Sequence, residues 1–190
     1  LDCMRLLRKS NATEQSIQVA VALSDELLHV TGCVATLVLD LLKPGGGQVF
    51  QRPDDALCTH THADFIGSMR GAWAAARQLA RIQGVNVSFD GRWRLMKDGQ
   101  PVQHITGRSA GGAATLGWYH AFSRTVVDPK LIVLAQISGP DRPTLGEATD
   151  GADYKLDGVG GMAAKVKAVA ADGRFDTIVV ASDGNQAEGE

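Results

Sequence analysis

Two polar residues in glycine-rich surroundings are the strongest candidates for chemistry in this chain. Ser109 lies in Thr-Gly-Arg-Ser-Ala-Gly-Gly, residues 106–112, and Lys165 follows Gly-Gly-Met-Ala-Ala, residues 160–164. A serine hydroxyl becomes a nucleophile when a base takes its proton, and a lysine is such a base when burial lowers its pKa and leaves the amine neutral. The pair therefore predicts hydrolysis of a peptide bond, provided that the fold brings the two side chains together.

The turn around Ser109 has further features that suit acyl transfer. Small neighbours leave room for a substrate carbonyl, and a helix predicted over residues 110–123 would leave the N–H groups of Ser109 and Ala110 free for a developing oxyanion. Neither motif is specific by itself. Most turns of this kind are structural or bind phosphate, and most helical lysines lie on the surface.

The histidines between residues 59 and 64 have two possible roles, as metal ligands or as part of a helix start. His60 and His62, in the segment 59–64, resemble part of a short string of metal ligands, for which a third ligand would have to come from Asp64, His29, His104 or His120. A helix start explains the segment more simply, with Thr59 or Thr61 as the N-cap and Asp64 near the positive end of the helix dipole. We expect no metal site.

His104 precedes Ser109 by five residues and suggests a different base. A hydrolase of small esters or amides could use this pair if the two side chains came within hydrogen-bond reach. On an extended segment that leads into the turn, however, His104 is expected to pack or to bond to the backbone.

Composition limits the class of protein. The chain has 190 residues, 44% of them hydrophobic, and a formal net charge of −2, with no basic block, so we expect no nucleic-acid or membrane partner. No transmembrane run or signal peptide is apparent. Cys3, Cys33 and Cys58 are widely spaced and odd in number, which is typical of reduced thiols in a cytoplasmic protein. The start at Leu1 suggests a domain excised from a longer chain.

The pattern of apolar residues predicts an α/β or α+β fold with mixed sheets and packed helices. Residues 1–28 are predicted to be a helical extension or a linker to a missing domain, in which Thr13 caps a helix over 14–28. Residues 29–190 are predicted to form one compact domain. The three tryptophans are assigned to packing. Helices are predicted over 61–83, 110–123 and 162–171, and strands over 34–42, 48–51, 85–89, 102–105, 131–137 and 177–181. Asp90-Gly91 is interpreted as a turn that ends the strand 85–89.

Taken together, these motifs resemble the proteolytic domain of the Lon protease family. There, a Gly-Pro-Ser-Ala-Gly turn carries the nucleophile, and a Gly-Gly-x-x-x-Lys segment carries the base. The order of the other segments is also similar: Val-Thr-Gly at 30–32, Lys-Pro-Gly-Gly-Gly at 43–47 like the family's Pro-Gly-x-Gly hairpin, the long helix at 61–83, Ile-Ser-Gly at 137–139, and the closing helix and strand. The resemblance covers residues 29–183.

The resemblance implies a function and assigns roles. Ser109 would be the nucleophile of an endopeptidase, Lys165 the general base, and Ser138 would replace the threonine that holds the lysine amine. The substrate would be a polypeptide, and the chain would form a homo-oligomer, with a hexameric ring as one form. The dyad needs no cofactor, and the chain has no Gly-x-x-x-x-Gly-Lys-Ser/Thr loop. ATP would act only through a domain outside this chain.

Several departures from the family pattern keep a second function open. Thr106 stands where the family often has an acidic residue, Arg108 replaces a proline, and Pro140 follows Gly139 in place of a glutamate. The segment 140–157 is longer than the family's hairpin and is predicted to be a long loop or an exposed hairpin. The missing acidic residues and the long segment favour a non-catalytic Lon-like scaffold or interaction domain, whereas the presence of Ser109, Lys165 and Ser138 together favours the enzyme. The Arg108 cation would help to keep Lys165 neutral or would bind an acidic side chain.

Overall fold

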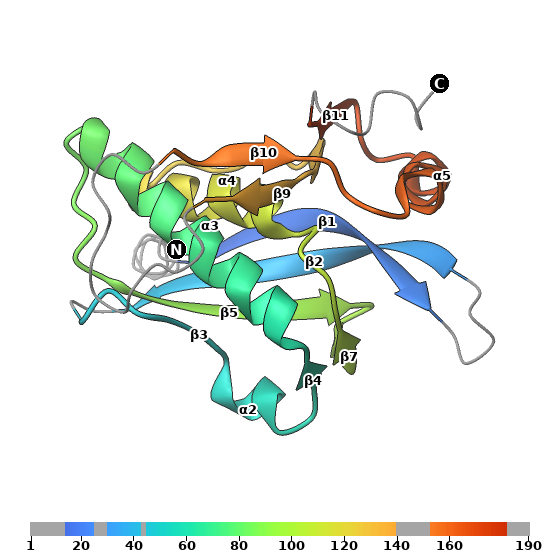
Figure 1. Cartoon of the computed structure of the whole chain (residues 1–190), viewed down its shortest axis with the longest axis horizontal. Helices are drawn as coiled ribbons and strands as arrows, with labels where there is room; N and C mark the ends of the chain where they lie inside the picture. The colour runs from blue at the N-terminus through green and yellow to red at the C-terminus, as the bar shows by residue number, and fades with distance from the viewer. Residues whose placement is uncertain (1–13, 25–29, 43–44, 140–152, 182–190) are drawn as a thin grey trace, which may run out of the picture.

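The computed structural model describes residues 14–24, 30–42, 45–139 and 153–181 (Figure 1). Its first element is a strand, β1 (Glu14–Ser24), which pairs antiparallel with β2 (Val30–Leu42) along its whole length. The prediction of a helix over residues 14–28 is therefore wrong for Glu14–Ser24. Alternate side chains explain the strand, because Gln15, Ile17 and Val19 are buried while Ser16 is exposed.

The pairing of β1 also corrects the domain boundary at residue 29. That boundary falls between two strands of one sheet, so Glu14–Ser24 is part of the compact fold and not an extension of it. The predicted Thr13 cap lies outside the described residues.

The main sheet has the order β1-β2-β5-β3, with the short strand β6 (Gln100–Pro101) pairing with β5. The strand β5 (Asp90–Lys97) is antiparallel to β2 and parallel to β3 (Val49–Gln51). The resemblance implied a hairpin at the glycine-rich segment between β2 and β3. Because β5 lies between these two strands in the sheet, they do not form a simple hairpin.

A further correction concerns the start of β5. Residues 85–89 are not in a strand, and Asp90-Gly91, expected to be a turn, instead begins β5. At Gly91 an added Cβ would lie 2.7 Å from the Trp73 ring and 3.0 Å from the Trp118 ring. The glycine is thus required by close packing against two aromatic rings.

Helices were predicted more accurately than strands. The helices α3 (Ala63–Ile82), α4 (Gly111–Ser123) and α5 (Met162–Asp172) lie within about two residues of their predicted bounds, and a short helix, α2 (Pro53–Ala56), was not predicted. The helices α3 and α4 pack side by side, and α4 covers β1 and β2 (Figure 1). The helix α5 also packs on β1 and β2.

Three two-stranded pairings complete the fold. Strand β4 (His60–Thr61) is parallel to β7 (His104–Ile105), and β8 (Leu131–Leu134) is parallel to the closing strand β11 (Thr177–Val180). Strand β9 (Gln136–Ser138) is antiparallel to β10 (Lys155–Asp157). The predicted strand 131–137 is therefore two strands that part at Ala135, and residues 140–152 of the predicted loop or hairpin lie outside the described residues.

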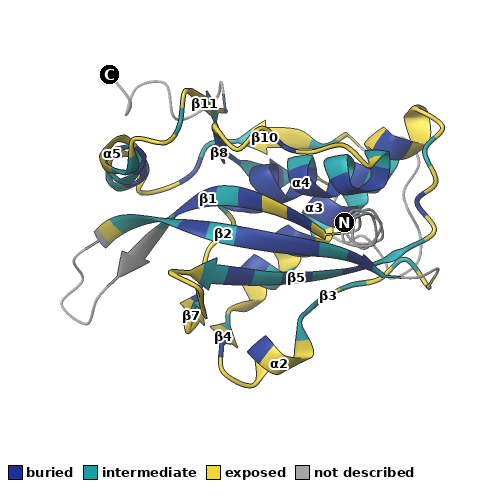
Figure 2. Cartoon of the chain, turned by 180° about the vertical axis from the view of Figure 1, so that it is seen from behind, coloured by how far each residue is buried: buried dark blue, intermediate teal, exposed yellow. Residues whose placement is uncertain are grey.

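Figure 2 shows buried residues on β1, β2, β5 and α4. The buried apolar side chains of the fold form two packed groups. The larger group lies between α3, α4 and the main sheet, and it contains all three tryptophans, which were predicted to pack. The rings of Trp73 and Trp118 meet edge to face, with centroids 4.7 Å apart. The smaller joins β1 and β8 to α5 (Ala20, Ile132, Leu134, Val159, Met162 and Val169). The fold is a compact α/β arrangement of helices and mixed sheets, as the sequence predicted. Among the described residues, no helix is long and apolar enough to span a membrane.

Candidate active site

Ser109 lies in a turn between β7 and α4, as predicted, and its side chain is half-buried. The turn is closed by a hydrogen bond from the Gly111 N–H to the Arg108 carbonyl oxygen at 3.1 Å, and Gly107 adopts a positive φ of 79°. The Arg108 side chain is exposed. The sequence thus places a serine at the N-terminal end of α4, where the first N–H groups have no partner within the helix.

Backbone donors near Ser109 fall into two groups. The N–H groups of Gly111 and Gly112 donate to Arg108 and Ala135, respectively. In the described part of the chain, the N–H groups of Ser109 and Ala110 have no backbone acceptor. Those two are the groups expected from the sequence to face an oxyanion, and they have the hydrogen-bonding capacity for it.

Lys165 is buried, with only 2% of its surface exposed, although it lies on a helix. Its Nζ donates a hydrogen bond to the Gly160 carbonyl oxygen at 2.7 Å. Burial lowers the pKa of Lys165 from 10.5 to about 8, because an ammonium loses its hydration in this position. A substantial fraction of this amine is therefore neutral near pH 8, which is the property a lysine base needs.

Ser138 ends β9, is half-buried and pairs in register with Lys155 of β10. Its neighbour Ile137 packs directly against α4, because a Cβ added to Gly111 would lie 2.9 Å from the Ile137 backbone nitrogen. The structure therefore brings the strand end that carries Ser138 against the start of the helix that follows Ser109.

The three predicted residues are not joined by hydrogen bonds. Over the described ranges, no hydrogen bond links Ser109 Oγ, Ser138 Oγ and Lys165 Nζ, and the lysine amine is bound to Gly160 instead. Lys165 reaches its position through α5, which β1 and β2 hold in place. At Gly32 of β2, an added Cβ would lie 2.0 Å from the carbonyl oxygen of Ala164, the residue before the lysine.

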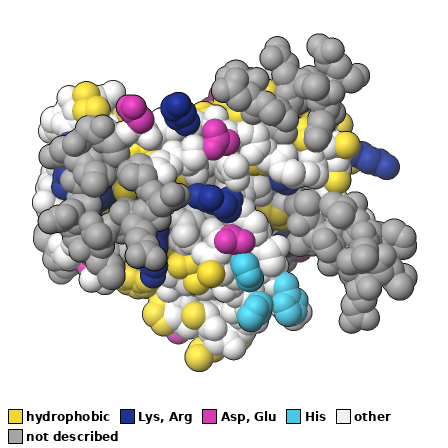
Figure 3. All heavy atoms as spheres, in the orientation of Figure 1, with side chains coloured by type: hydrophobic (Ala, Val, Ile, Leu, Met, Phe, Trp, Pro, Cys, Tyr) yellow, Lys and Arg dark blue, Asp and Glu magenta, His cyan; other side chains and the backbone are white. Residues whose placement is uncertain are grey.

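The histidines have other partners. His104 is exposed on β7 opposite His60, with ring centroids 6.1 Å apart, and within the described residues it makes no hydrogen bond to Ser109. His62, and not Thr59 or Thr61, caps α3: its Nδ1 accepts a hydrogen bond from the Asp64 N–H at 3.3 Å. Histidine side chains gather on one face of the molecule (Figure 3), but no group of three possible metal ligands was found among the described residues.

Sequence reasoning missed one residue at this site. Ser68 lies on the buried face of α3, 1% exposed, and its Oγ donates a hydrogen bond to the Arg108 carbonyl oxygen at 2.9 Å. The available signal was its position in the apolar stripe, between Phe65 and Met69, where a hydroxyl needs a partner.

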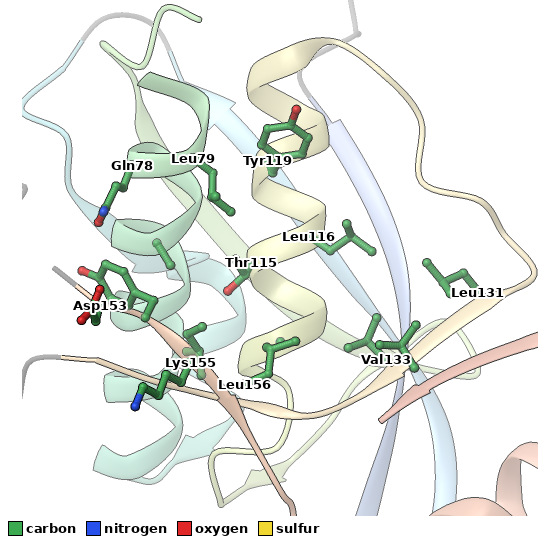
Figure 4. Close-up of a pocket in the computed structure, with 15 residues that line it drawn as sticks. Gln78, Leu79, Thr115, Leu116, Tyr119, Leu131, Val133, Asp153, Lys155 and Leu156 are labelled. Carbon is green, nitrogen blue, oxygen red and sulfur yellow. The ribbon is translucent and has the colours of Figure 1, made fainter. Parts of the chain in front are cut away.

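A pocket of about 550 Å³ lies between α3, α4, β8 and β10, and its lining includes none of Ser109, Ser138 and Lys165. Figure 4 shows leucines from several elements around it, including Leu79 of α3, Leu116 of α4 and Leu131 of β8. Gly112 and Ile137 also line it, so one wall belongs to the segments that carry Ser109 and Ser138. The size and largely apolar lining suit an apolar group of a ligand.

Comparison with known proteins identifies no matching family model and no curated protein with significant sequence similarity.

Proposed function

We propose that this chain is a Lon-like serine endopeptidase domain that hydrolyses polypeptides through a Ser109–Lys165 dyad. The observation that carries the proposal is the burial of the Lys165 amine, whose pKa is lowered to about 8. A lysine used only for solubility would keep its ammonium in water, because burying it costs free energy. The free N–H groups at Ser109 and Ala110 give further support.

The proposed reaction has two steps. Lys165 takes the Ser109 proton while Ser109 Oγ attacks the substrate carbonyl, and the resulting oxyanion accepts hydrogen bonds from the N–H groups of Ser109 and Ala110. Lys165 then gives the proton to the leaving amine, which leaves an acyl-enzyme on Ser109. Lys165 then deprotonates a water molecule, which attacks the ester carbonyl. As the bond from Ser109 Oγ to the acyl carbon breaks, Lys165 returns the proton to Ser109 Oγ, which releases the carboxylic acid and restores the neutral amine. The lysine amine must exchange its bond to Gly160 for one to Ser109, and Ser138 would hold it there.

The remaining expectations belong to the same proposal. The substrate is a polypeptide, with an apolar side chain near the scissile bond accommodated by the adjoining pocket. We further infer a homo-oligomer, such as a hexameric ring, in the cytoplasm. Any ATP-driven step would come from a domain outside this chain.

The proposal is tested by Ser109→Ala. The wild type is expected to cleave an unfolded protein such as casein and to become labelled at Ser109 by a fluorophosphonate. Ser109→Ala should lose both reactions and keep its circular dichroism spectrum, whereas substitution of an exposed serine, Ser88→Ala, should change neither. Cleavage that persists in Ser109→Ala would exclude Ser109 as the nucleophile.

A non-catalytic scaffold is the second candidate, and one observation favours it. The Lys165 amine is bound to the Gly160 carbonyl and not to Ser109. A wild-type chain that is folded, is not labelled at Ser109 and does not cleave casein at pH 9, where most of the amine is neutral, would support the scaffold.

A further inference from the structure

Ser68 is a buried hydroxyl that contacts the turn carrying Ser109. Its Oγ donates to the Arg108 carbonyl oxygen at 2.9 Å, from a side chain that is 1% exposed. The same carbonyl oxygen accepts the Gly111 N–H at 3.1 Å. Two donors therefore fix the direction of the carbonyl immediately before the proposed nucleophile.

That carbonyl and the Ser109 N–H belong to one peptide unit. The unit is planar and trans, so its C=O and N–H bonds point in opposite directions and turn together. A donor that holds the Arg108 carbonyl therefore also sets the direction of the Ser109 N–H. The hydrogen bond from Ser68 also polarises the peptide group, which strengthens its N–H as a donor.

Close packing around Gly111 keeps Ser68 in place. A Cβ added to Gly111 would lie 2.6 Å from Ser68 Oγ, so only a glycine lets the hydroxyl approach the turn this closely. On the other side of the turn, the Gly112 N–H donates to the Ala135 carbonyl at 2.9 Å. The turn is thus anchored to α3 by a side chain and to the β8–β9 segment by the backbone.

We propose that Ser68 is a positioning residue that acts through the Arg108 carbonyl to aim the Ser109 N–H at the oxyanion; the inference rests on the proposed peptidase function. As the bond from Ser109 Oγ to the substrate carbon forms, the carbonyl π electrons move to oxygen, and this N–H stabilises the resulting charge. Ser68 gains and loses no proton in the reaction. Its hydroxyl stays bonded to Arg108 throughout.

The experiment compares Ser68→Ala with Ser123→Ala. Ser123 lies at the other end of α4, and in the described part of the chain its buried hydroxyl has no hydrogen-bond partner. Loss of a whole oxyanion donor lowers kcat by about 10²–10³-fold. Misdirection of one donor should cost less, so we expect kcat to fall about 10- to 100-fold in Ser68→Ala with KM nearly unchanged. Ser123→Ala should keep the wild-type kcat.

An inhibitor pair separates positioning from general destabilisation. A peptide aldehyde forms a hemiacetal on Ser109 whose oxygen occupies the oxyanion position, so its affinity should fall in Ser68→Ala by about the same factor as kcat. The matching peptide amide forms no such adduct, and its affinity should stay constant. Ser68→Cys keeps a weak donor of similar size and should recover part of kcat. If Ser68→Ala does not fold, the test uses Ser68→Cys. A lower kcat and a lower aldehyde affinity than in the wild type would support the proposal, and wild-type values of both would contradict it.

The outcomes are distinguishable from failure of the proposed function. Equal kcat and equal aldehyde affinity in the wild type and in Ser68→Ala would overturn the role of Ser68 and leave the peptidase intact. A parallel loss of aldehyde and amide affinity would also overturn it, because that pattern indicates a purely structural hydroxyl. A wild-type chain that neither cleaves peptides nor binds the aldehyde would overturn the peptidase proposal itself.

Discussion

At the scale of single residues, Lys165 departs most from ordinary behaviour. Its sequence surroundings favoured a surface position, yet the side chain is 2% exposed and the amine donates a hydrogen bond to the Gly160 carbonyl oxygen. Burial removes the hydration that stabilises the ammonium, and this is why the pKa of Lys165 falls to about 8. The chain therefore keeps a destabilising group where the proposed chemistry needs it.

The first consequence concerns activity. If Lys165 is the base, only its neutral form is productive, so kcat/KM should rise with pH through an apparent pKa of about 8. Lys165→Met keeps the stem, removes the amine and should abolish turnover. A pH–rate profile of peptide cleavage measures this. A rate that is flat between pH 6.5 and 9.5, or full activity in Lys165→Met, would contradict the assignment.

The second consequence concerns stability. Between pH 8 and 10.5 the unfolded chain still holds a proton that the folded chain has released, so stability should rise with pH across this window and gain nothing below it. At pH 7 the buried ammonium costs up to roughly 3 kcal/mol, and Lys165→Met should recover much of that. Urea unfolding at pH 7 and pH 9.5 tests this, with Lys167→Met, an exposed lysine of the same helix, as the control. If Lys165→Met and Lys167→Met changed the free energy of unfolding equally at both pH values, burial of the Lys165 ammonium would not be destabilising.

At the scale of elements, the packing of α5 on β2 determines where Lys165 lies. Gly32 makes this contact possible, since a Cβ there would lie 2.0 Å from the Ala164 carbonyl oxygen. Neither backbone can yield easily, so a larger residue must displace the helix. Gly32 ends the Val-Thr-Gly segment that resembles the Lon family, and its contact with the Ala164 carbonyl is the reason that a glycine is needed there.

We therefore expect Gly32→Ala to shift α5 away from the sheet. Overpacking of this kind costs about 1–3 kcal/mol, and cleavage should fall because the lysine moves with its helix. Gly67→Ala is the matched control, because no atom lies within 4 Å of a Cβ at this exposed position of α3, where alanine also favours the helix. Thermal unfolding and casein cleavage measure both effects. A Gly32→Ala variant as stable and active as Gly67→Ala would show that α5 is not held in this way.

At the scale of the whole molecule, β1 is the part that sequence reasoning misplaced. It pairs with β2 over all eleven of its residues, and its side chains enter both groups of buried residues. This strand begins with polar residues and continues into an apolar run over residues 19–23, and the mixture was interpreted as helical. The hydrophobic effect stabilises the strand only once α4 covers one face and β8 and α5 lie against the other.

A buried charge in β1 should therefore destabilise the domain. Val19 is 1% exposed, so Val19→Asp would bury a carboxylate without a partner and should cost at least about 3 kcal/mol. Ser16→Asp places the same carboxylate on an exposed position of the same strand and should change stability by less than about 0.5 kcal/mol. Circular dichroism during thermal unfolding compares them. Equal stability of the two variants would mean that residues 14–24 are dispensable, as an extension would be.

The sequence by itself determined the α/β class, the three long helices and the position of Ser109 before α4, because helical periodicity and turn glycines are local signals. The tertiary structure decided the identity of β1, the insertion of β5 between β2 and β3, and the burial of Lys165. Each of these depends on partners distant in the sequence. The hydrogen bond from Ser68 spans forty residues, and no local pattern specifies its acceptor.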